Sequence, residues 1–75
     1  MLTPNQKIGL AVLDYHGGQF TPTYAVGSTL IAGMMPDNET IVKAVAELRH
    51  LYGMPEHWSD RHLKITIARL EKLIA

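Results

Sequence analysis

The sequence predicts an all-α fold, a small compact bundle of three long helices and one short element, with residues 1–75 forming a single helical domain. Proline follows a capping threonine at Thr3-Pro4 and again at Thr21-Pro22, which is typical of helix starts. Apolar residues also recur every three or four positions in three segments, which indicates amphipathic helices. Finally, 47% of the residues are hydrophobic and 19% are charged, which are globular values. Because each apolar stripe must be buried against another, these helices are expected to pack into a bundle.

The first helix is predicted over about residues 4–16. Thr3 is its N-cap, Pro4 its first helical residue, and Gln6 can close a capping box. Gly17-Gly18 supplies the stop. One face then carries the apolar residues Ile8, Ala11, Val12 and Tyr15.

Residues 22–32 allow two interpretations. Thr21-Pro22 and Gly33 mark a short helix between them. A hairpin is the alternative, because Gly27-Ser28 is an acceptable two-residue loop. Strand formers surround that loop at Tyr24, Val26, Thr29 and Ile31. We favour the helix, because its flanking signals are helical and a lone hairpin is barely stable.

The longest apolar stripe follows Pro36. Asp37 or Asn38 is expected to cap this helix, Gly53 to end it, and Pro55 to prevent its resumption. The stripe consists of Ile41, Val45, Leu48 and Tyr52.

A last helix is predicted from Ser59, its expected cap, as far as the C-terminus. Its stripe consists of Leu63, Ile67, Leu70 and Ile74. Trp58, just before the cap, is expected to fold back onto the core as an anchor.

Composition argues against several classes of function. Without cysteine the chain has no disulfide and no thiolate metal site. It has neither a Gly-x-Ser-x-Gly elbow nor a phosphate-cradling loop, so we expect no enzyme and no cofactor. Three histidines, His50, His57 and His62, could meet, but their spacing is poor for zinc and we expect no metal. No signal-peptide core or membrane span is evident, so a cytoplasmic location is the default expectation.

The last predicted helix carries a basic face. At about 100° per residue its cations fall within an arc of about 140°, opposite the apolar stripe. Ile65 lies in the middle of this arc. The cations are Arg61, Lys64, Arg69 and Lys72. Such a face suits an acidic partner surface or phosphates.

Residues 24–54 resemble a helix-turn-helix or winged-helix unit. The resemblance is carried by a short element with Val26, Leu30 and Ile31, the turn Met34-Met35-Pro36, and a longer helix that begins Asn38-Glu39-Thr40-Ile41 and ends Glu47-Leu48-Arg49-His50-Leu51-Tyr52-Gly53. In that family the second helix enters the major groove of DNA. The resemblance implies DNA contacts from Asn38, Thr40, Lys43 and Arg49.

Two functions follow as hypotheses. The first is a small non-catalytic regulator that binds another protein, as an inhibitor, adaptor or regulatory subunit of the kind found among phage and mobile-element products. The alternative is a helix-turn-helix transcriptional regulator that binds DNA as a homodimer. Protein binding is placed first because seven basic residues only balance seven acidic ones. In addition, Glu39 and Glu47 would repel phosphates.

Overall fold

Each helix begins where a side chain can cap it. The computed structural model describes residues 1–75 and contains four α-helices, one 3-10 turn and no strand. These elements are α1 (Pro4–Leu13), α2 (Pro22–Ile31), α3 (Asn38–Tyr52), η1 (Pro55–His57) and α4 (Arg61–Glu71). The all-helical fold is therefore confirmed, and the segment after Thr21 is a helix and not a hairpin.

The first three N-caps are those that the sequence predicts. Thr3 and Gln6 form a reciprocal capping box, in which each side chain accepts the other residue's backbone N–H, at 3.1 and 2.9 Å. Thr21 accepts the N–H of Tyr24 at 3.1 Å. Of the two candidates for α3, the cap is Asp37, which accepts from Thr40 N–H at 2.8 Å.

The predicted cap of the last helix is wrong by one residue. Asp60, not Ser59, caps α4, and its carboxylate accepts the N–H of Leu63 at 3.1 Å. Ser59 instead has a φ of 76°, in the left-handed region that non-glycine residues rarely adopt. This residue redirects the chain from η1 into α4.

Two helices are shorter than their apolar patterns predict. α1 ends at Leu13 and not at residue 16, because the chain tightens into turns in which Tyr15 N–H bonds the Val12 carbonyl at 3.0 Å. α4 ends at Glu71, so Ile74 lies beyond the helix and is 36% exposed. α2 ends as predicted before Gly33, whose φ of 81° suits glycine.

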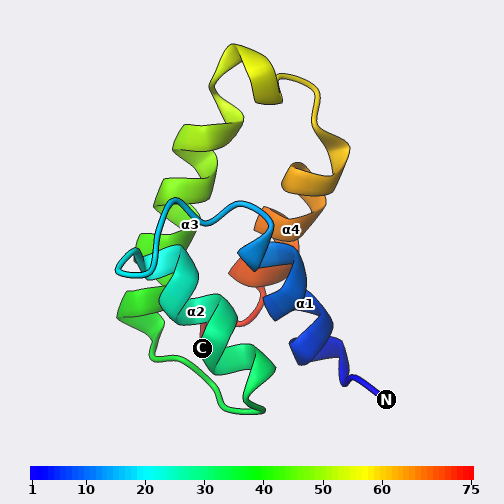
Figure 1. The fold of residues 1–75 in the computed structure, drawn as a ribbon, viewed down its shortest axis with the longest axis vertical. Helices are drawn as coiled ribbons and strands as arrows, with labels where there is room; N and C mark the ends of the chain where they lie inside the picture. The colour runs from blue at the N-terminus through cyan, green and yellow to red at the C-terminus, as the bar shows by residue number, and fades with distance from the viewer.

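The core lies where the four helices meet. In Figure 1, α3 runs along one side of the molecule, α4 along the other, and α1 and α2 fill the lower part. Every helix contributes to a cluster of ten buried hydrophobic residues. They are Val12, Val26, Leu30, Ile41, Ala44, Val45, Leu48, Leu63, Ile67 and Leu70. None of the helices is long and apolar enough to span a bilayer.

Trp58 does not anchor the core. It is 81% exposed and lies in the short connection between η1 and α4. The prediction failed because the geometry of this short connection, rather than the size of the side chain, decides which way the indole points.

α1 and α2 approach closely at a pair of glycines. A Cβ atom added to Gly9 would lie 2.8 Å from Leu30 Cβ and 2.9 Å from the Gly27 carbonyl oxygen. A Cβ added to Gly27 would lie 2.6 Å from two atoms of the Leu13 side chain. Both distances are shorter than van der Waals contact, so only glycine fits at this crossing without movement.

α2 is held at both ends by side chains of other helices. Gln6 of α1 donates from Nε2 to the Ile31 carbonyl at 3.0 Å. Glu47 of α3 accepts from the N–H and the hydroxyl of Thr23, at 3.0 and 2.9 Å. A carboxylate at a helix N-terminus also interacts favourably with the macrodipole.

Leu48 and Leu70 test the assignment of the core. Both side chains are almost completely buried, so replacing either by alanine should cost about 2–5 kcal/mol of unfolding free energy, because a cavity remains. Leu10, which is 45% exposed, is the matched control and should cost about 0.5 kcal/mol or less. Urea denaturation measures all three. A loss below about 1 kcal/mol at both core sites would contradict the packing described.

Gly9 tests the helix crossing. Although alanine favours a helix by about 1 kcal/mol over glycine, Gly9→Ala should lower stability by about 1–3 kcal/mol, because its methyl group meets a backbone carbonyl and a Cβ that cannot move aside. Gly17→Ala is the control, since its nearest neighbour would be 3.9 Å away. Equal midpoints of thermal unfolding for both variants would show that α1 and α2 are not in close contact.

Candidate functional site

The exposed side of α4 carries the basic face that the sequence predicts. α4 buries Leu63, Thr66, Ile67 and Leu70, and the opposite side faces solvent. Ile65 is 48% exposed in the middle of that side. The exposed cations around it are Arg61, Lys64, Arg69 and, at the C-cap, Lys72.

None of these four cations forms an ion pair within the protein. On α3, by contrast, Lys43 pairs with Glu39 at 3.1 Å and Arg49 pairs with Glu71 of α4 at 2.7 Å. Arg69 and Lys72 also have no carboxylate three or four residues away along the helix, where it could pair with them. The positive charge of the α4 face is therefore not neutralised from within.

A groove continues this face toward α1. It has a volume of about 430 Å³ and lies between the start of α1 and the end of α4. Its lining residues are Pro4, Lys7, Ile8, Arg69, Lys72 and Leu73. Lys7 was missed by the sequence analysis, because only the packing of α1 against α4 brings it beside Arg69 and Lys72.

The residues assigned to DNA reading lie near the start and along the exposed side of α3. Most of them already have partners in the protein. The Asn38 amide exchanges two hydrogen bonds of 3.1 Å with the backbone of Ala75, and Lys43 and Arg49 form the ion pairs given above. Thr40 is partly buried beside the Asp37 cap. The linker from α2 to α3 spans residues 32–37, longer than the turn of about 3–4 residues in helix-turn-helix units.

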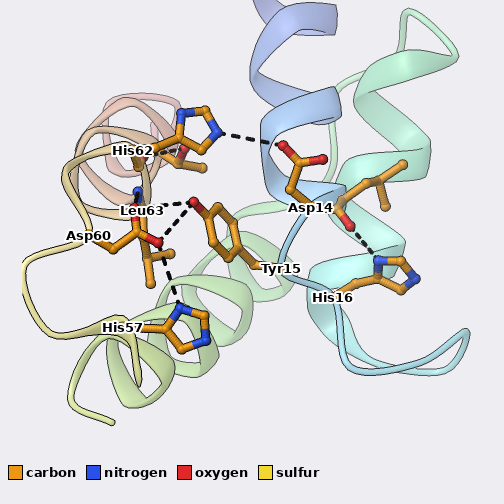
Figure 2. Close-up of polar contacts among 9 residues, drawn as sticks. Asp14, Tyr15, His16, His57, Asp60, His62 and Leu63 are labelled. Atoms are coloured by element: carbon orange, nitrogen blue, oxygen red, sulfur yellow. Dashed lines mark hydrogen bonds and ion pairs between the residues drawn. The ribbon is translucent and has the colours of Figure 1, made fainter. Parts of the chain in front are cut away.

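A second polar cluster joins α1 to the start of α4. Figure 2 shows Tyr15 reaching from the end of α1 with its hydroxyl directed at Asp60. That hydroxyl donates to the Asp60 carboxylate, with oxygen distances of 3.3 and 3.5 Å. His57 Nδ1 lies 3.6 Å from the same carboxylate. His57 and His62 place their rings 6.1 and 5.7 Å from the Tyr15 ring.

Burial and hydrogen bonding shift two pKa values in this cluster. Burial, reinforced by the negative charge of Asp60, raises the pKa of Tyr15 to about 12. The backbone N–H of Leu63 holds the pKa of Asp60 below its ordinary value of 3.8, and Tyr15 and His57 act in the same direction. Because the Asp60 carboxylate caps α4 and also accepts a hydrogen bond from the Tyr15 hydroxyl, this cluster ties the end of α1 to the start of α4.

The four histidines do not gather at one site: His57 and His62 both lie beside Tyr15, whereas His16 and His50 lie elsewhere. His62 Nε2 is 3.6 Å from Asp14 Oδ2, and His16 Nδ1 contacts the Leu13 carbonyl at the end of α1 (Figure 2). His50 is exposed on α3. No three His, Asp or Glu side chains in the structure are arranged to hold a metal ion, so His50, His57 and His62 do not form the cluster that their sequence positions left open.

The chain matches no known protein-family model, no curated protein and no solved structure. Its site must therefore be interpreted from its own geometry, and the feature that stands out is the unpaired positive charge on α4 and in the adjoining groove.

Tyr15 predicts how stability changes in alkali. Above pH 10, the ordinary tyrosine pKa, the unfolded chain loses the phenol proton while the folded protein retains it up to about pH 12. The stabilisation that the raised pKa of Tyr15 gives the folded protein is therefore complete below pH 10 and is lost as the pH rises from 10 toward 12. The thermal midpoint of the wild type should fall more steeply over this window than that of Tyr15→Phe. Tyr24→Phe, which removes a hydroxyl without a partner, should behave like the wild type. Parallel curves for all three proteins would exclude the Tyr15–Asp60 contact.

Proposed function

We propose that this chain is a small non-catalytic regulator that binds an acidic surface of another protein through the exposed face of α4. The observation that carries the proposal is the set of four cations on that face, none of them paired within the protein, around the half-exposed side chain of Ile65. Exposed charges of one sign without internal partners are available to a partner of the opposite sign.

The composition of the face supports an interface with a desolvated centre. Ile65 would fill an apolar pocket of the partner, and the cations around it would pair with carboxylates at the rim. Arg61 and Arg69 are suited to this role, because a guanidinium can bind a carboxylate through two parallel hydrogen bonds. Inhibitors, adaptors and regulatory subunits work by such docking.

DNA binding through α3 remains the alternative proposal, with less to support it. Asn38, Lys43 and Arg49 would have to leave partners inside the protein before they could contact bases or phosphates. Asp37 and Glu39 also place negative charge at the start of the helix that would enter the major groove.

Capture from lysate of the source cells, followed by titration of the purified partner, tests the proposal. The immobilised wild type should retain a protein that the variant Arg61→Glu/Arg69→Glu does not retain. Ile65→Ser should weaken binding by about tenfold or more, because it removes the apolar anchor. Val42→Ser on α3 is the matched control, since Val42 is 51% exposed and Ile65 is 48% exposed. This control should bind like the wild type.

Circular dichroism must show that all variants remain helical, as expected for side chains that face solvent. Retention of the partner by the folded double reversal would contradict the α4 interface. A titration with random duplex DNA addresses the alternative: an affinity that falls steeply with salt would favour DNA as the ligand, because counterion release accompanies phosphate binding.

A further inference from the structure

We infer that the groove between α1 and the end of α4 binds an acidic peptide segment in which an apolar side chain lies between carboxylates. The inference rests on the proposed function and deepens it, because it names the chemistry of the partner and adds Lys7 to the interface. The groove volume of about 430 Å³ is within the range of ligand clefts.

Positive charge converges on this groove from opposite ends of the chain. Lys7 comes from α1, Arg69 from the last turn of α4, and Lys72 from its C-cap. None of the three forms an ion pair, and no acidic residue lines the groove. A carboxylate of a ligand would therefore meet attraction from several directions without competition from the protein's own acids.

Lys7 distinguishes this arrangement from ordinary helix electrostatics. A cation near the end of α4, such as Arg69 or Lys72, is stabilised by the macrodipole of its own helix. Lys7 lies near the start of α1, where the macrodipole disfavours a cation, and the first turn of α1 contains no acidic residue that would offset it. Its charge therefore does not stabilise α1 and is available to a ligand.

Apolar groups make up the other half of the lining. Ile8 and Leu73 are partly buried against the core, which fixes their positions, and Pro4 is the rigid first residue of α1. A lone phosphate would use only the three cations. A peptide with an apolar residue among its acids would use the cations and also cover the exposed parts of Ile8 and Leu73.

The groove and the α4 face form one continuous surface. Arg69 and Lys72 belong to both, while Lys7 belongs only to the groove and Arg61 only to the face. An acidic segment in the groove would therefore extend directly from a partner docked around Ile65. This division of residues allows the two proposals to be tested separately.

The test uses a blocked pentapeptide of four glutamates around a central leucine, titrated into the ¹⁵N-labelled protein. Saturable amide shifts at Lys7, Ile8 and Leu73 are expected, with a dissociation constant in the millimolar range. Lys7→Gln should weaken binding about three- to fivefold, the effect of losing one exposed charge pair. Lys43→Gln also removes one exposed cation, but from α3, and should leave the affinity unchanged.

Five results would overturn the inference. The first is equal weakening by Lys7→Gln and Lys43→Gln. Three concern the ligand: equal binding of the peptide with glutamines in place of glutamates, equal binding with glycine in place of leucine, and tripolyphosphate binding as tightly as the peptide. The last result would identify a phosphate site. Absence of shifts at peptide concentrations up to about 10 mM would also overturn it.

Failure of this inference can be told apart from failure of the proposed function. If Arg61→Glu and Ile65→Ser abolish capture of the partner but the peptide does not bind the groove, only the groove assignment is wrong. If the peptide binds and depends on Lys7, but capture survives the changes at Arg61 and Ile65, only the α4 face is wrong.

Discussion

The close crossing of α1 and α2 is the contact on which the other helices depend. At Gly9 and Gly27 the two backbones approach without side chains between them, so the helices behave as one paired unit. Val12, Val26 and Leu30 of this pair lie in the core together with side chains of α3 and α4. If the two helices stood further apart, these side chains could not fill the space between α3 and α4 at native packing density.

α2 depends on its neighbours in a second way. It carries no charged residue of its own, and the polar groups at its ends are bonded by Gln6 and Glu47 from α1 and α3. Short isolated helices are marginal in water, so α2 is stabilised by these contacts rather than by its own propensity. Although Glu47 is an exposed residue of α3, its carboxylate is thereby engaged by the N-terminus of α2.

Patterns of burial could be predicted from the sequence, whereas contacts between distant segments could not. The burial of a residue such as Leu48 can be predicted because apolar residues recur along α3 with the helical period. Trp58 carries no such periodic signal, and it lies exposed in a short connection, next to Ser59 with its φ of 76°. The basic face of α4 was visible because it lies within one helix. Tyr15 beside Asp60 and Lys7 beside Arg69 each require knowledge of how α1 crosses α4.

The unpaired cations of α4 also give the molecule a permanent electric dipole, even though its net charge is zero. Four of the seven Lys and Arg residues lie between positions 61 and 72, whereas only one of the seven Asp and Glu residues does. An approaching acidic surface would attract α4 and repel the remainder, and so would rotate the molecule during diffusion. Association of this neutral protein would therefore be accelerated by long-range orientation and slowed by added salt, as with strongly charged proteins.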